Sequence, residues 1–213
     1  MILTEEKLRG VKPYWDRLER AGFIVEQFGW AIEEPLLDVG CGEKHLKQAL
    51  PGGFSYTGLD LSACADVRCN LDGGQIPFKE NSFATVVCAD VLEHLENIHR
   101  VFIDLFRITS RHLIVSLPNC WCDLKYLMAL GGRGSGKFYG LPAVRPQDRH
   151  RWFFNYSEAR RFLIENSRTT TRSARLYRYY GPQGRTFRLG RILLPGSRFD
   201  DLFVNTLWAV FEK

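Results

Sequence analysis

The chain has 213 residues, of which 45% are apolar and 25% are charged, and its formal net charge is +5. This length suits one α/β domain with elaborations, and the composition is that of an ordinary globular protein. No apolar run approaches the ~20 residues that a membrane span needs, and the acidic start MILTEEKLRG lacks the apolar region of a signal peptide. The six cysteines match no paired C-x-x-C zinc motif. We therefore expect a cytoplasmic protein with reduced thiols.

Predicted elements follow in chain order. Two helices are expected between residues 4 and 30, with Thr4 as N-cap and Pro13 between them. Apolar runs predict strands over 36–39, 54–59, 66–69, 82–89 and 112–117, and closing strands over 173–180 and 205–212. Helical patterns cover 43–50, 95–108, about 124–130, and a stretch from an N-cap at Ser157 to about 166. This alternation predicts an α/β fold with a mostly parallel sheet covered by helices on both faces.

Charge is unevenly distributed along this order. Residues 1–130 contain 13 Lys and Arg against 18 Asp and Glu, whereas residues 131–191 contain 14 Lys and Arg against three acids. A basic second part is either a solvated surface or one that attracts an anionic substrate, nucleic acid or a membrane surface. Its first stretch, GGRGSGKFYGLPAVRPQDRHR, is too long for a simple connection and predicts a lid or a binding loop.

The stretch LLDVGCGE predicts a ligand site. A short buried strand ends in a turn with Gly40 and Gly42, and a helix-favouring segment follows, which is how an open α/β sheet holds a nucleotide-like ligand. Asp60 ends the second strand of this sheet, 22 residues after Asp38, where a carboxylate can accept hydrogen bonds from ribose hydroxyls. The third glycine of a dinucleotide-binding motif is missing, which disfavours a dehydrogenase.

These segments together resemble the class I S-adenosylmethionine-dependent methyltransferases, with a methyltransferase type 11-like domain. LLDVGCGE, YTGLDLS, NLDGGQIPFKENSFATVVCADVLEHL and LIVSLPN follow the order of that family's motifs over roughly residues 34–120. Two positions depart from the pattern: Lys44 replaces the last glycine of the first motif, and Ala84 replaces an aspartate.

The resemblance implies a Rossmann-like, doubly wound sheet of seven mostly parallel strands and S-adenosylmethionine as cofactor. It divides the single expected domain into N-terminal helices (1–33), a cofactor-binding half (34–117), a lid or substrate insertion (118–156) and a closing helix and strands (157–213). The implied cofactor contacts are Asp38, Gly40, Cys41, Gly42, Asp60, Leu61, Asn70, Leu71, Asp90 and Val91. Among them, Asp60 would hold the ribose, Leu61 would lie under the adenine, and Asp90 and Val91 would border the sulfonium.

Methyl transfer to a hydroxyl needs a group that takes the hydroxyl proton. Glu93 and His94 follow the fourth strand at the edge where ligands of such sheets bind, and His150 is a second candidate base. The residues proposed to bind an anionic acceptor are Tyr139, Arg145, Arg149 and Arg151. For these histidines and arginines, structural support and plain solvation remain the alternatives. The leading expectation is O-methylation of a small or medium anionic acceptor, such as a sugar or a lipid-linked glycan.

Two alternative functions remain open from the sequence. Asp90, Glu93, His94 and His150 also resemble the metal-binding set of small-RNA 2′-O-methyltransferases, which would hold Mg²⁺ or Mn²⁺. No RNA-binding module is evident, so we predict no metal, and nucleic acid is the less favoured partner. The changes at Lys44 and Ala84 also permit an accessory protein that binds the cofactor without catalysis.

Overall fold

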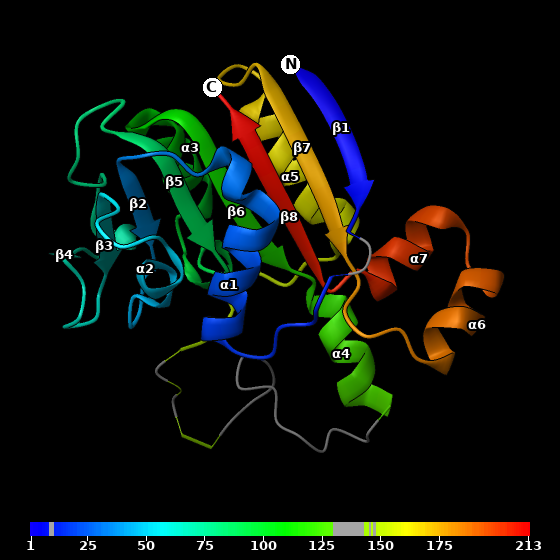
Figure 1. The fold of residues 1–213 in the computed structure, drawn as a ribbon. Helices are drawn as coiled ribbons and strands as arrows, with labels where there is room; N and C mark the ends of the chain where they lie inside the picture. The colour runs from blue at the N-terminus through cyan, green and yellow to red at the C-terminus, as the bar shows by residue number, and fades with distance from the viewer. Residues whose placement is uncertain (9–10, 130–142, 145, 147) are drawn as a thin grey trace.

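The structure is a computed structural model that describes residues 1–8, 11–129, 143–144, 146 and 148–213. Its centre is an eight-stranded sheet with the strand order β1-β7-β8-β6-β5-β2-β3-β4 (Figure 1). β8 runs antiparallel to both of its neighbours, β6 and β7, and the other neighbouring strands pair in parallel. Within the described residues, no helix is both long and apolar enough to cross a membrane.

The strands are β1 (Ile2–Lys7), β2 (Leu36–Val39), β3 (Tyr56–Asp60), β4 (Val67–Arg68), β5 (Phe83–Ala89), β6 (Thr109–Pro118), β7 (Ser173–Tyr179) and β8 (Thr206–Glu212). The α-helices are α1 (Arg17–Phe28), α2 (His45–Ala49), α3 (Ile98–Ile108), α4 (Cys120–Ala129), α5 (Tyr156–Ser167), α6 (Arg185–Leu193) and α7 (Gly196–Phe203). A short 3-10 turn, η3 (Leu92–His94), follows β5.

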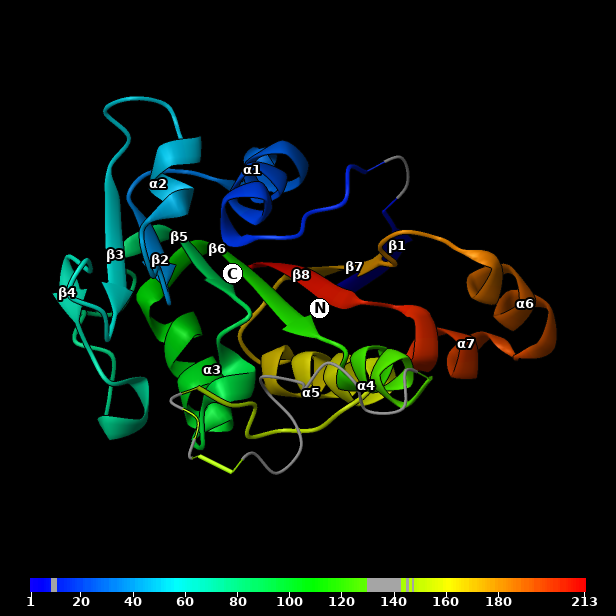
Figure 2. The ribbon, with the colours of Figure 1, turned by 90° about the horizontal axis from the view of Figure 1, so that it is seen from below.

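Helices cover both faces of the sheet (Figure 2). Side chains alternate along a strand, so Leu36 packs under α1 and α2 while Leu37 packs under α3 and α5. On the α1 face, the fully buried Trp208 contacts the rings of Phe23 and Phe28. Every residue of the central strands β2 and β5 is therefore buried, and both strands are largely apolar.

The N-terminus differs from the sequence prediction. Residues 2–7 form an edge strand, β1, paired in parallel with β7, and helix α1 begins only at Arg17. The expected cap at Thr4 is therefore wrong, and Asp16 caps α1 by accepting a hydrogen bond from the Glu19 N–H. Pairing with the free edge of β7 prevails over the local helical signal, and the Glu5 carboxylate fixes it by accepting a 2.6 Å hydrogen bond from Arg160.

Three further features of the fold differ from the prediction made from the sequence. The sheet has eight strands rather than seven because β1 extends it. Asn155, not Ser157, caps α5, and with Glu158 it forms a reciprocal capping box. Two short helices, α6 and α7, lie between β7 and β8, where no helix was predicted.

The site lies at one edge of the sheet. β2, β3 and β5 are parallel, so their carboxyl ends and the loops that follow them meet on the same side. β7 runs in the same direction, since it is antiparallel to β8, which is antiparallel to β6. The segments after β2, β3, β5, β6 and β7 therefore all start at this carboxyl edge (Figure 1).

Candidate active site

The turn after β2 requires glycine. Gly40 has φ +75°, and a Cβ there would lie 2.3 Å from Cγ2 of Val91. Gly42 has φ +52°, and a Cβ there would lie 3.1 Å from the Arg17 guanidinium. The turn is thus packed between the loop after β5 and helix α1, and its backbone is free of side-chain bulk where a ligand can approach.

Asp60 is tied to this turn. One of its carboxylate oxygens accepts a 2.9 Å hydrogen bond from the Gly42 N–H, and the other accepts a 2.8 Å bond from the Ser62 N–H. Each oxygen keeps a second lone pair that can accept a further donor. The end of β3 therefore presents an oriented carboxylate beside the glycine turn, which is what a vicinal diol needs.

Lys44, which stands where the family pattern has a glycine, takes a left-handed conformation with φ +57°. The backbone thus keeps the geometry that a glycine would favour, although a lysine adopts it at some cost. The Lys44 ammonium donates a 2.5 Å hydrogen bond to Asp66, which also accepts from the Gly58 N–H. This lysine is therefore held by an acid at the start of β4, and the turn is preserved.

Asp90, just after β5, is held from two sides. Arg20 of α1 forms an ion pair with one carboxylate oxygen, and the Ser116 hydroxyl donates to the other. Asp90 itself has φ +52°, a strained conformation for a residue other than glycine. These contacts fix the loop after β5 and bring α1 to the site, a role that the sequence did not predict for Arg20 or Ser116.

The turn η3 places a buried carboxylate beside this loop. The Glu93 side chain is fully buried, and among the described residues neither of its carboxylate oxygens has a hydrogen-bond partner. Burial, followed by repulsion from Asp90, raises the pKa of Glu93 well above its usual range. A buried carboxyl group without a hydrogen-bond partner is costly, which makes Glu93 a candidate residue of the site.

Two imidazoles converge on Glu93. The Nε2 atoms of His94 and His150 lie 3.6 Å and 4.0 Å from its Oε1, and the two rings meet edge to face. The three side chains place one ligand-type atom each within 4.8 Å of one another. We call Glu93, His94 and His150 the acid–histidine cluster.

A neighbouring acid orients His94, and backbone hydrogen bonds fix the segment that follows His150. Nδ1 of His94 lies 2.8 Å from an Asp148 carboxylate oxygen, which favours a proton on Nδ1 and leaves Nε2 as an acceptor. Burial lowers the pKa of His150 to about 4, so its ring is neutral at physiological pH. The segment after His150 is fixed by hydrogen bonds from the N–H groups of Arg151 and Trp152 to the Glu93 carbonyl.

Residues 37–112 match a family model described as a methyltransferase domain. This stretch contains the glycine turn, Asp60, Asp90 and two members of the acid–histidine cluster. The chain carries a methyltransferase domain. Its fold is that of S-adenosylmethionine-dependent methyltransferases, and this family implies S-adenosylmethionine as the cofactor. The family predicted from the sequence is therefore confirmed.

Solved structures show the same fold over nearly the whole methyltransferase chain. A SAM-dependent methyltransferase from Archaeoglobus fulgidus is 12% identical with a TM-score of 0.61, covering 92% of this chain and 94% of that one. The methyltransferase domain of a bacterial protein, CtHen1-C, is 19% identical with a TM-score of 0.57 over 92% and 97% of the two chains. Magnesium protoporphyrin IX methyltransferase from Synechocystis PCC 6803 is 20% identical with a TM-score of 0.50 over 91% and 81%. No curated protein matches the sequence.

Other residues predicted to contact the cofactor lie near the same edge of the sheet. The buried carboxyl of Asp38 accepts a 2.7 Å bond from the Tyr56 hydroxyl, and burial raises its pKa to about 6. Leu61 is 62% exposed and offers an apolar surface beside Asp60. Asn70 caps a short turn through its side chain, and the Leu71 side chain is buried, so Leu71 could reach a ligand only through its backbone. The cofactor contacts themselves stay predictions.

The predicted acceptor residues are only partly described. Tyr139 and Arg145 lie outside the described residues. The Arg149 carbonyl oxygen lies 3.2 Å from Nδ1 of His94, and the Arg151 guanidinium forms a 3.2 Å ion pair with Glu96. The sequence missed Asp148 as the partner of His94, although its position two residues before His150 and its acidic side chain in a basic segment were visible.

Proposed function

We propose that this methyltransferase transfers the methyl group of S-adenosylmethionine to a hydroxyl oxygen of an anionic acceptor. The observation that carries the proposal is the acid–histidine cluster next to Asp90, because a neutral hydroxyl is a weak nucleophile and the cluster offers a group that can take its proton. In the reaction the methyl C–S bond breaks, the C–O bond forms and the hydroxyl proton passes to the protein. Nε2 of His94, with its tautomer set by Asp148, is the proposed proton acceptor.

The cofactor is proposed to lie along the glycine turn, with Asp60 on the ribose hydroxyls and Leu61 under the adenine. The Gly40 and Gly42 backbone would face the methionine end, where Arg17 and Arg20 of α1 supply positive charge close to the turn and to Asp90. Cys41, Asp38 and Val91 would complete the wall around this end, as the family resemblance implies. This arrangement would align the sulfonium with the loop after β5.

An apolar cavity supports an acceptor with a hydrophobic part. Its volume is about 290 Å³, and Trp152, Phe153 and Phe154 line it with Arg161 and His99. Trp152 follows His150 by two residues and is anchored by a 2.6 Å hydrogen bond from its indole N–H to the Leu95 carbonyl. A cavity with aromatic walls, which Arg161 and Glu158 also line, fits the hydrophobic part of an amphiphilic acceptor such as a lipid-linked sugar.

A second candidate is RNA 2′-O-methylation with a divalent cation, as the resemblance to small-RNA methyltransferases implies. It is favoured by the donor set, because one carboxylate and two imidazole nitrogens suit Mn²⁺ or Mg²⁺, and the Glu93 carboxylate accepts no hydrogen bond from any described residue. Asp148 would then orient His94 as the outer partner of a metal ligand. A bound cation would polarise the acceptor hydroxyl.

The test is transfer of a labelled methyl group to matched acceptors, with and without EDTA followed by Mn²⁺. The panel pairs hydroxyl-bearing sugar phosphates and lipid-linked glycans with RNA oligonucleotides and with amines. Label on an anionic hydroxyl compound in the presence of EDTA supports the proposal. Label on RNA ribose that requires Mn²⁺ supports the second candidate. Label on amines alone, or cofactor binding without any transfer, contradicts both.

A further inference from the structure

Helix α6 presents apolar side chains to solvent. Leu189, Ile192 and Leu193 are 58%, 80% and 67% exposed, whereas Phe187 and Gly190 on the opposite side are buried. At 100° per residue the three exposed residues fall on one side of the helix together with Arg185 and Arg188. We call Arg185, Arg188, Leu189, Ile192 and Leu193 the α6 face. Adjacent exposed side chains of this size are unusual for a surface that meets only water.

The α6 face is held rigidly from behind. The ring of Phe187 packs against Tyr180, Phe199 and Phe203. At Gly190, an added Cβ would lie 2.5 Å from the Phe203 ring, so the backbone of α6 lies directly on α7. The exposed side chains therefore belong to a helix that is packed against the rest of the protein. Figure 1 shows α6 beside α7.

The charge around these apolar residues has one sign. Residues 181–198 include four arginines and no acid, and Arg185, Arg188 and Arg191 form no ion pair with the described residues. The nearest acids are already engaged: Asp200 pairs with Arg178 and accepts from Tyr180, and Asp201 accepts from the Ser157 N–H. The face is thus basic as well as apolar.

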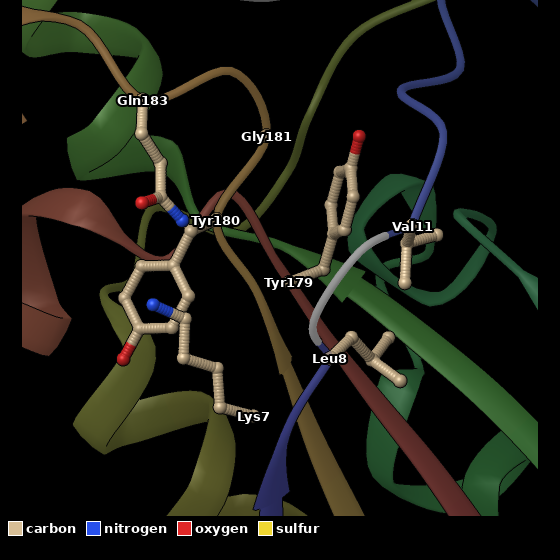
Figure 3. A pocket seen from close by; sticks show the side chains of 7 residues that line it. All are labelled: Lys7, Leu8, Val11, Tyr179, Tyr180, Gly181 and Gln183. Carbon is tan, nitrogen blue, oxygen red and sulfur yellow. The ribbon is translucent and has the colours of Figure 1, made fainter.

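Two cavities lie beside the N-terminal end of α6. One, of about 280 Å³, lies between the carboxyl ends of β1 and β7, where the Lys7 ammonium sits 4.6 Å from the centre of the Tyr180 ring (Figure 3). The other, of about 520 Å³, is lined by Lys7, Gln183, Phe187, Arg188, Arg191 and Ile192. Lys7 and Gln183 line both cavities, so the two cavities lie side by side. The larger cavity brings three cations beside an exposed isoleucine.

We propose that the α6 face docks this protein on an anionic phospholipid surface. Leu189, Ile192 and Leu193 would enter the boundary between headgroups and acyl chains, while Arg185 and Arg188 bind lipid phosphates and the cavity of Lys7, Arg188 and Arg191 receives a headgroup. This combination of apolar and basic side chains on one helix is what interfacial membrane binding requires.

Other occupants fit less well. A second copy packed on this face about a two-fold axis would place arginines opposite arginines. Single-stranded nucleic acid is bound by aromatic stacking, and the α6 face offers aliphatic side chains instead. α6 follows β7, so it starts from the same carboxyl edge of the sheet as the loop that carries Glu93 and His94. The docking itself does not depend on the proposed acceptor.

The test is flotation of the full chain with phosphatidylcholine vesicles, with and without phosphatidylglycerol. The wild type is expected to float with the anionic vesicles, and Leu189→Ser with Ile192→Ser is expected to weaken this binding about tenfold or more, since both side chains lose burial in the membrane. The matched control is Leu18→Ser with Ile103→Ser, two side chains that are 52% and 54% exposed on α1 and α3. This control is expected to bind as the wild type does.

Two double arginine variants test whether the α6 face binds lipid phosphates or whether any basic surface of the protein would do so. Arg185→Gln with Arg188→Gln is expected to abolish the preference for anionic vesicles, whereas the exposed pair Arg168→Gln with Arg172→Gln is expected to keep it. No flotation of the wild type, or equal loss in both control pairs, would overturn the proposal. If the wild type is a dimer that Leu189→Ser with Ile192→Ser separates, a second copy is the occupant and the proposal is overturned. The same holds for RNA if that variant loses RNA binding and the wild type does not bind vesicles. Unchanged S-adenosylmethionine affinity in every variant separates this outcome from failure of the site.

Discussion

Replacing Glu93 by Gln is expected to reduce the rate of methyl transfer by up to about 10²–10⁴-fold, the range for a positioned proton-transfer group, because Glu93 lies beside Nε2 of His94, the proposed proton acceptor. Glu93 is the point on which both histidines converge, and amide nitrogen in place of one oxygen would disturb proton transfer and any cation held there. The dissociation constant for S-adenosylmethionine is expected to stay within about twofold, because Glu93 lies outside the glycine turn. Single-turnover transfer and calorimetric titration measure the two effects separately.

The matched control for this variant is Glu96→Gln. Glu96 lies three residues further on, is exposed, and pairs with Arg151 at the surface. Its replacement is expected to leave the rate nearly unchanged. Glu93→Gln also removes a buried carboxylate that has no donor, so thermal unfolding should show a protein at least as stable as the wild type. A Glu93→Gln protein that keeps wild-type rates would exclude the cluster from the chemistry.

Replacing Gly40 by Ala is expected to weaken S-adenosylmethionine binding by about tenfold or more, equivalent to about 1.4 kcal/mol. The new methyl group would lie 2.3 Å from Val91 Cγ2, and the turn has φ +75°. The backbone must therefore move away from the loop after β5, and the N–H groups that face the ligand move with it. Calorimetric titration of the folded variant measures the loss.

Two further variants isolate the cause. Gly53→Ala introduces the same kind of backbone strain, with φ +82°, but nothing lies within 4 Å of the added methyl group. It is expected to lower stability by about 1–2 kcal/mol without changing cofactor affinity. Adding Val91→Ala to Gly40→Ala removes the contacting Cγ2 and is expected to restore part of the binding. Wild-type affinity in Gly40→Ala would show that the turn does not carry the cofactor.

Sequence alone predicted the cofactor half of the fold well. The runs that became β2 and β5 are buried on both faces, so they are apolar apart from Asp38 and Thr85 and were readily predicted as strands. The glycine turn was equally clear, because Gly40 combines a positive φ with a close neighbour, and both restrict the position to glycine. In these segments the local sequence pattern and the tertiary structure require the same residue types, apolar residues in the strands and glycine in the turn.

Features that depend on distant pairing were missed. β1 forms because β7, more than 160 residues later, offers a free parallel edge, and nothing within residues 2–7 reports that edge. Arg20 reaches Asp90 only because α1 packs over the carboxyl edge of the sheet. From the residues alone, Glu93 and His94 were one candidate pair and His150 another, and only the resemblance to small-RNA methyltransferases grouped the three with Asp90. Their convergence required the backbone hydrogen bonds that pin residues 151 and 152 to Glu93.

Calorimetric titration with S-adenosylmethionine and with its demethylated product is the measurement to make first, on the wild type, Asp60→Ala and the exposed control Glu43→Ala. Asp60 is held beside the turn by the N–H groups of Gly42 and Ser62, whereas Glu43 lies on the same turn and faces solvent. Micromolar binding that Asp60→Ala abolishes and Glu43→Ala retains is the expected result. Failure of the folded wild type to bind either compound, or equal binding by Asp60→Ala, would contradict the cofactor site described above.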